Sequence, residues 1–250
     1  MRSRQDRENE AQLNRELGIV VGAVCRGRQK NGKKATPVSS QVSVNSSARQ
    51  VPVPTAFSVL AIGISTGGPK ALSQLIPALP GHFPLPIVLV QHMPALFTKA
   101  MADDLNRKSA LEVLEAAEGD SVQPGRVLIA PGNRHMVVRH TPKGMIVGIN
   151  GGQKENGCRP AVDVLFRSVA SSYGNRGVLA AIMTGMGSDG TKGVQALKRQ
   201  GCFCLTQSKA SCVVYGMPQI VDSMGLSDGS VNLNQFAERL TALATNGRRR

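Results

Sequence analysis

A serine stands in a turn between an apolar run and a helix-like segment, in the sequence Gly63-Ile64-Ser65-Thr66-Gly67. The spacing matches the G-x-S-x-G pattern of a nucleophile elbow, in which small flanking residues permit a sharp turn that exposes the hydroxyl. Amides at the start of the following helix would point to the same place and could stabilise an oxyanion. Glycine-rich turns at helix starts also bind phosphate without catalysis, so an anion cradle and a plain turn stay open as alternatives.

A nucleophilic serine needs a base to remove its proton, and histidine is the usual base. The chain has four histidines. His82 lies in a Pro/Gly loop, whereas His135 and His140 lie near the ends of a predicted hairpin. Only His92 directly follows a buried strand-like run, in the sequence QHMP. His92 is therefore the candidate base, with a structural hydrogen bond at a strand end as the alternative.

An aspartate lies near the end of a third candidate turn, TGMGSDG at 184–190. Asp189 could orient the imidazole and stabilise its cationic form. Because a helical pattern begins at Thr191, Asp189 is an equally good helix N-cap, and the spacing does not decide between these roles. Backbone amides of the same turn offer a third contribution, which is to hold an oxyanion.

The candidate triad runs in the order Ser, His, Asp along the chain, whereas α/β-hydrolases place the acid before the histidine. Their order would require His135 or His140 together with an earlier acid such as Asp120. Both histidines belong to the predicted hairpin segment. We therefore expect a different fold that uses the same triad chemistry.

The elements that must position these residues read as strands alternating with helices. Apolar runs predict main-sheet strands at 58–64, 85–91, 177–184 and 202–206. Amphipathic segments, two of which open with proline, predict helices at 69–79, 95–107, 160–173, 191–199, 217–224 and 232–244. Short segments at 111–116, 126–130, 136–139 and 145–149 predict an antiparallel hairpin layer.

This alternation predicts an α/β fold with a doubly wound, mostly parallel sheet, helices on both faces and an antiparallel hairpin insertion. Ligands bind at the carboxyl ends of the strands in such sheets. Ser65, His92 and Asp189 each follow a predicted strand. We therefore expect the three side chains to meet at one edge of the sheet.

Basic charge is concentrated at the two ends of the chain. The formal net charge is +14, and residues 1–55 hold ten Lys and Arg against four Asp and Glu. We interpret 1–55 as a basic, mostly disordered arm and linker, 56–245 as one catalytic domain and 246–250 as a basic tail. A basic chain can attract nucleic acid. With no Trp and two Tyr the chain has few stacking platforms, so we expect no nucleic-acid partner.

The five cysteines match no zinc-binding spacing, and their number is odd. We expect free thiols, as in a reducing compartment, and neither a metal nor another cofactor. No apolar stretch reaches the roughly 18 residues that a membrane span needs, and the N-terminus lacks a secretory signal. These features predict no membrane insertion and a cytoplasmic location.

Six sequence blocks together resemble the catalytic domain of the CheB-type chemotaxis protein-glutamate methylesterases. They are IGISTGG at 62–68, QHMP at 91–94, IAPG at 129–132, RPAVDVLF at 159–166, TGMGSDG at 184–190 and ASCVVYGMP at 210–218. The blocks occur in the family's order and cover about residues 57–245. A set of ordered blocks is far more specific than a single serine elbow.

The resemblance implies a serine hydrolase with a doubly wound sheet. It assigns the nucleophile to Ser65, the base to His92 and the orienting acid to Asp189, with Thr66 and Met186 shaping the oxyanion site. It also implies hydrolysis of glutamate methyl esters on chemoreceptor helices, with release of methanol, and in some members deamidation of glutamine. The expected partner is a methylated chemoreceptor or a similar acidic, helical signalling protein.

Family members usually carry an N-terminal phosphoryl-accepting receiver domain. Residues 1–55 are too short for that fold and lack its acidic cluster, so we expect this chain to lack the receiver. Two other functions stay open from the residues. A phosphate- or nucleotide-binding module would use 65–68, although that turn lacks the P-loop ending and the dinucleotide-loop spacing. A non-catalytic scaffold would bind receptors and leave the triad unused.

Overall fold

A computed structural model describes residues 56–246, all within the compact unit Gln50–Arg250. The predicted arm at 1–55 lies outside the described residues, as does the predicted tail beyond residue 246.

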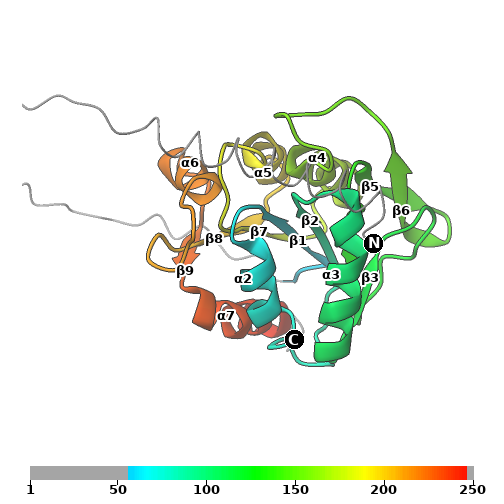
Figure 1. Cartoon of the computed structure of the whole chain (residues 1–250), viewed down its shortest axis with the longest axis horizontal. Helices are drawn as coiled ribbons and strands as arrows, with labels where there is room; N and C mark the ends of the chain where they lie inside the picture. The colour runs from blue at the N-terminus through cyan, green and yellow to red at the C-terminus, as the bar shows by residue number, and fades with distance from the viewer. Residues whose placement is uncertain (1–55, 247–250) are drawn as a thin grey trace, which may run out of the picture. The chain divides into compact units, whose positions relative to one another are not determined.

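A seven-stranded sheet lies at the centre, in the order β3-β4-β2-β1-β7-β8-β9, and all of its strand pairs are parallel (Figure 1). The inner strands are continuous buried runs, because helices cover both faces. The predicted fold class is thus confirmed. The strands are β1 (Val59–Ile64), β2 (Ile87–Gln91), β3 (Glu112–Glu115), β4 (Arg126–Ile129), β7 (Val178–Ile182), β8 (Phe203–Gln207) and β9 (Gly229–Val231).

Two hydrophobic cores form because alternate residues of each strand point to opposite faces of the sheet. Leu60 and Ile62 join the core under α2 (Gly68–Leu75), α3 (Ala95–Lys108) and α7 (Leu233–Asn246). Val59 and Ala61 join the core under α4 (Val162–Tyr173), α5 (Thr191–Lys198) and α6 (Met217–Ser223). The two groups of helices lie on opposite sides of the sheet in Figure 1.

The remaining strands, β5 (His135–Thr141) and β6 (Gly144–Asn150), form the antiparallel hairpin. The hairpin packs on α4, since the Val138 amide donates to Ser168 Oγ (2.9 Å) and Ser172 Oγ donates to the Val138 carbonyl (2.8 Å). This confirms an antiparallel insertion.

Extending that layer back to residue 111 was wrong, because β3 and β4 join the edge of the main sheet in parallel. β3 and β4 have only four residues each, which is too short for their apolar pattern to identify the partner strand. The structure also contains β9, a three-residue strand that the sequence did not predict because it contains no apolar run.

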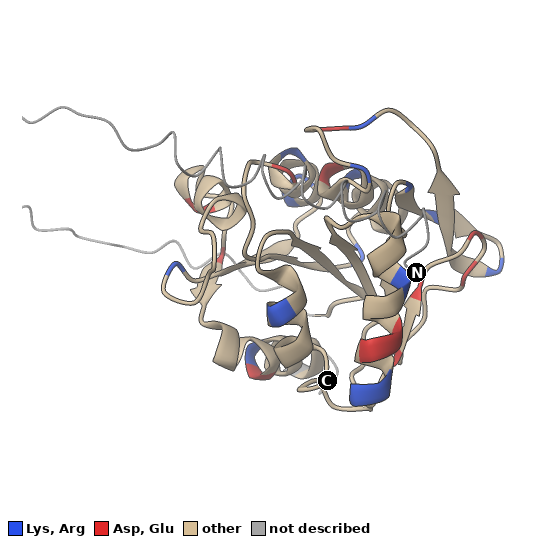
Figure 2. Cartoon of the chain, viewed as in Figure 1, with Lys and Arg blue, Asp and Glu red and all other residues tan. Residues whose placement is uncertain are grey.

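Charged side chains of both signs lie on the helices and loops, whereas β1, β2 and β7 carry none (Figure 2). Charged groups near these three central strands are therefore found in the turns that follow them and not within the strands. No helix between residues 56 and 246 is both long and apolar enough to span a membrane.

Candidate active site

Three neighbouring turns at the carboxyl edge of the sheet carry the predicted residues. Ser65 directly follows β1, His92 directly follows β2, and Asp189 lies in the turn between β7 and α5. Since β1 lies between β2 and β7 in the sheet, the three turns are adjacent. Buried parallel strands thus bring together residues that are up to 124 positions apart in the printed sequence.

Hydrogen bonds hold the three turns in register. The His92 amide donates to the Ile64 carbonyl (3.2 Å), and the Ser65 amide donates to the Thr184 carbonyl (2.9 Å). The buried Gln91 side chain joins two turns, because its Nε2 donates to the carbonyls of Ser65 (3.1 Å) and His92 (2.9 Å). The backbones at the serine and the histidine are therefore fixed relative to one another.

A glycine allows the β7–α5 turn to approach the serine. A Cβ atom placed on Gly185 would lie 2.8 Å from Ser65 Cβ and 2.4 Å from Met217 Sδ, which is closer than real atoms pack. Any larger residue at Gly185 would push the turn away from the serine. Steric crowding thus explains why the first of the three glycines in the TGMGSDG block, Gly185, is a glycine.

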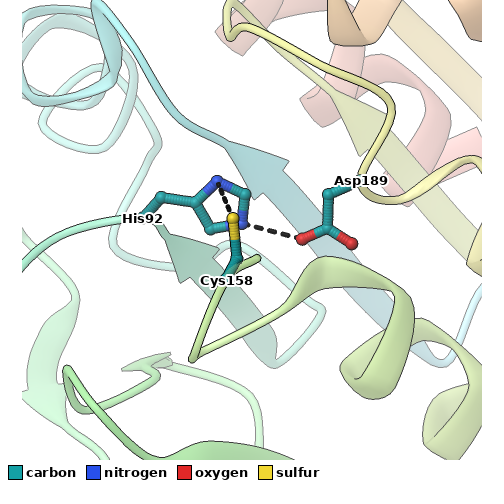
Figure 3. A group of neighbouring side chains, drawn as sticks. All are labelled: His92, Cys158 and Asp189. Carbon is teal, nitrogen blue, oxygen red and sulfur yellow. Dashed lines mark hydrogen bonds and ion pairs between the residues drawn. The ribbon is translucent and has the colours of Figure 1, made fainter. Parts of the chain in front are cut away.

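Asp189 and His92 are directly hydrogen bonded, with 2.8 Å between Asp189 Oδ2 and His92 Nε2 (Figure 3). Asp189 is buried, with 3% of its surface exposed, whereas 14% of the His92 side chain is exposed. An imidazole that donates through Nε2 has Nδ1 as its unprotonated nitrogen in the neutral form. The contact therefore leaves Nδ1 available to accept a proton.

Asp189 is also a helix cap, but of a different helix from the one expected. Its Oδ2 accepts the Val162 amide (2.7 Å) and its Oδ1 accepts the Asp163 amide (3.1 Å), both at the start of α4. The helix that follows it in sequence, α5, has Gly190 as its N-cap, with no side-chain cap. The expected role of Asp189 as N-cap of the helix that begins at Thr191 was therefore wrong, and its Oδ2 instead contacts both the imidazole and the start of α4.

The contact between Asp189 and His92 shifts the pKa values of both residues. Burial is the largest influence on Asp189 and raises its pKa, but the His92 hydrogen bond and the α4 amides outweigh it and lower the pKa overall. Burial also lowers the pKa of His92, yet hydrogen bonds and charge from Asp189 and Cys158 together raise it from 6.5 to about 9. The carboxylate thus favours the imidazolium, which is the form that a general base adopts after taking a proton.

Cys158, which the sequence did not single out, contacts the other imidazole nitrogen. Its Sγ lies 3.7 Å from His92 Nδ1, and Figure 3 shows the sulfur drawn across the imidazole ring. Asn156 was missed as well, and its Nδ2 donates to Asp189 Oδ1 (2.8 Å). Both lie in the loop before α4, and no spacing motif links that loop to a histidine more than 60 residues earlier.

The half-buried Ser65 has a hydroxyl that hydrogen bonds to no other residue between 56 and 246. In that same range, the amides of Thr66 and Met186 donate to no acceptor, and both side chains are exposed. Unpaired amides beside a free hydroxyl are what an oxyanion site requires, and catalytic hydrogen bonds often tighten only when substrate binds. The assignments of Ser65, Thr66 and Met186 remain predictions.

Comparisons with known proteins cover the part of the chain that holds these residues. The sequence profile of the family described as CheB methylesterase matches residues 60–240. A protein-glutamate methylesterase/protein-glutamine glutaminase of Desulfotalea psychrophila is 46% identical over 184 residues, covering 73% of this chain and 50% of the relative. One from Treponema pallidum is 47% identical over 182 residues, covering 73% and 45%. The chain thus spans about half the length of these relatives.

A solved structure is also similar. The Thermotoga maritima CheB methylesterase catalytic domain is 41% identical, with a TM-score of 0.73, and the match covers 75% of this chain and 99% of that domain. The matched part therefore corresponds to a complete catalytic domain in that protein.

Proposed function

The chain belongs to the CheB methylesterase family, and we propose that it hydrolyses glutamate methyl esters on a chemoreceptor-type protein with Ser65, His92 and Asp189 as its triad. The observation that carries the proposal is the 2.8 Å contact between Asp189 and His92 Nε2 at the sheet edge that also bears Ser65. The names of the relatives support the reaction, including a second activity on glutamine.

The reaction follows from the orientation of the imidazole. Because Asp189 accepts from Nε2, Nδ1 of neutral His92 takes the Ser65 proton while Oγ attacks the ester carbonyl carbon. The amides of Thr66 and Met186 hold the developing oxyanion. The bond to the methoxy group then breaks, and His92 passes its proton to the departing oxygen to give methanol.

Water completes the cycle by the same route. His92 takes a proton from water, which attacks the acyl-enzyme, and the bond to Ser65 Oγ breaks with return of the proton. The products are glutamate and the restored serine. With glutamine in place of the ester, the same steps release ammonia.

A polar cavity of about 430 Å³ adjoins the serine turn and gives space for the substrate chain. It is bordered by Gly67, Lys70 and Gln74 on the α2 side and by Gln207, Ser211 and Asn232 opposite. Lys70 and the amide side chains suit an acidic, polar helix better than an apolar one. Neither the nucleotide-binding module nor the scaffold gains a specific supporting observation.

Methanol release from a methylated chemoreceptor fragment tests this function. Ser65→Ala should lower kcat by more than about 10⁴-fold, since removal of a triad nucleophile leaves only the contributions of binding and the oxyanion site. Ser188→Ala is the matched control, because Ser188 is exposed in the neighbouring turn and should retain activity. Equal loss in both variants, or methanol release unaffected by Ser65→Ala, would refute the assignment of the nucleophile.

A further inference from the structure

The cavity beside the serine turn carries charge of one sign only. Among the described residues that line it, Lys70 is the only charged side chain, and no aspartate or glutamate is present. The other polar side chains on its walls, including Gln74, Gln207 and Asn232, are neutral. A hollow with one cation and no anion attracts a negatively charged group.

Lys70 has no carboxylate partner among the described residues. Lys99 and Lys108 of α3 and Lys198 of α5, by contrast, each contact an aspartate. The Lys70 side chain is exposed, and its ammonium group donates to no other described residue. It is therefore free to bind an anion that enters the cavity.

Helix stability does not explain a lysine at this position. Lys70 lies in the first turn of α2, close to the N-cap Gly67, and that turn holds no acidic residue. The positive end of the helix dipole disfavours a cation there. Lys70 therefore makes the helix start still more electropositive, which suits an anionic ligand and not the helix itself.

A carboxylate on the substrate fits this position. Gly67 lines the cavity and lies in the same turn as Ser65, so the cavity opens beside the proposed nucleophile. On a helix, side chains three or four residues apart share one face, with about 5–6 Å between their Cβ atoms. One substrate helix can therefore present an ester to Ser65 and a glutamate carboxylate to Lys70.

We propose that this cavity is a carboxylate subsite, in which Lys70 binds a glutamate side chain about one helical turn from the ester on the same substrate helix. The subsite rests on the proposed function, which supplies the ester. A second methyl ester or a glutamine at the neighbouring position is neutral and lacks this contact. Because hydrolysis converts a neutral ester into a carboxylate, each demethylation creates a better neighbour for the next ester on that face of the helix.

Initial rates of methanol release by the full chain test the subsite with two helical peptides. Both peptides carry one glutamate methyl ester, and the positions about one turn away on either side are glutamate in one peptide and glutamine in the other. The wild type should have a kcat/KM about three- to fivefold higher for the glutamate peptide, which is the effect of an exposed ion pair. Lys70→Gln should lose this preference, and Lys70→Arg should keep it.

Lys192→Gln is the matched control, because Lys192 is exposed in the first turn of α5 and does not line the cavity. It changes the net charge by the same amount as Lys70→Gln and should keep the preference. Equal kcat/KM for the two peptides in the wild type, or an unchanged preference in Lys70→Gln, would overturn the proposal.

Peptide binding distinguishes failure of the subsite from failure of the proposed function. By fluorescence anisotropy, the full chain with Ser65→Ala should bind the glutamate peptide about three- to fivefold more tightly than the glutamine peptide, and adding Lys70→Gln should remove the difference. Equal binding of the two peptides would overturn the subsite even in an active esterase. A Lys70-dependent difference in a chain that releases no methanol would support the subsite and count against the proposed esterase alone.

Discussion

Two buried aspartates on the same side of the sheet invite comparison. Asp189 precedes α5 but caps α4, whereas Asp163, in the first turn of α4, accepts the Gly193 amide in the first turn of α5 (2.6 Å). Asn156 donates to both carboxylates, at 2.8 Å each. The two carboxylates thus brace each other's helices in a reciprocal arrangement.

The difference between them is the imidazole. His92 contacts Asp189, whose pKa is lowered, while Asp163 has no histidine partner among the described residues and burial raises its pKa. Burial and amide donors at a helix start are common to both sites, so those features alone do not define a catalytic acid. The contact with the imidazole at the end of a neighbouring strand is what distinguishes Asp189 from Asp163.

The largest difference between the two aspartates should be in how their substitution affects activity. Asp189→Asn should lower kcat by about 10³–10⁴-fold, because an amide cannot hold the same tautomer or stabilise the imidazolium. Asp163→Asn should keep kcat within about threefold, since it touches no reacting group. Methanol release by both variants, with circular dichroism to verify folding, measures this. Comparable losses in the two variants would mean that helix bracing, and not the imidazole contact, sustains activity.

The pH dependence of His92 should sharpen the contrast. With a pKa of about 9, the imidazole is neutral in about 1% of molecules at pH 7, so kcat/KM should rise with pH and level off above about 9. NMR titration of the ring should give that value in the wild type and in Asp163→Asn, and a lower one in Asp189→Asn. A ring pKa in Asp189→Asn that equals the wild-type value would show that the carboxylate does not act on the ring.

Stability at neutral pH should be sensitive to Asp163 even though activity is not. Asparagine at 163 places an amide group against either the buried Gly193 amide or Asn156 Nδ2, so one of these two donors loses its acceptor. We expect Asp163→Asn to lower the free energy of unfolding by about 1–3 kcal/mol. Urea denaturation measures the change, with the exposed Asp103→Asn as a control that should stay within about 0.5 kcal/mol.

Lowering the pH should change the stabilities of Asp189→Asn and Asp163→Asn, each measured relative to the wild type, in opposite directions. The folded-state pKa of Asp189 is lowered, so its stabilising effect is present above the unfolded value of 3.8 and is lost as pH falls through the folded value. The folded-state pKa of Asp163 is raised, so its ionisation destabilises the folded state as pH rises above 3.8. As pH falls, the stability deficit of Asp189→Asn relative to the wild type should shrink and that of Asp163→Asn should grow. Parallel changes in urea midpoints would contradict these shifts.

The sequence was sufficient to predict which edge of the sheet carries the site, but not how all of the strands pair. Continuous apolar runs identify β1, β2, β7 and β8 as buried parallel strands. Because ligand sites lie beyond the carboxyl ends of such strands, the turns that carry Ser65, His92 and Asp189 could be selected. The β3–β4 pair was misplaced because strands this short do not encode which neighbour they pair with.

Residues that act through tertiary contacts gave no local signal. Asp189 caps a helix that begins before it in sequence, and Cys158 reaches His92 only because the loop before α4 folds over the sheet edge. Spacing rules describe caps and ligands within one element or one turn, so neither contact follows from them.

The most direct test of the account is covalent labelling of the serine. An active-site-directed fluorophosphonate should modify Ser65 in the wild type and in Asp163→Asn at similar rates, and more than about 10³-fold more slowly in Asp189→Asn, as mass spectrometry of the modified peptide would show. Labelling at another residue, or equal rates in the two aspartate variants, would contradict the claim that Asp189 activates Ser65 through His92.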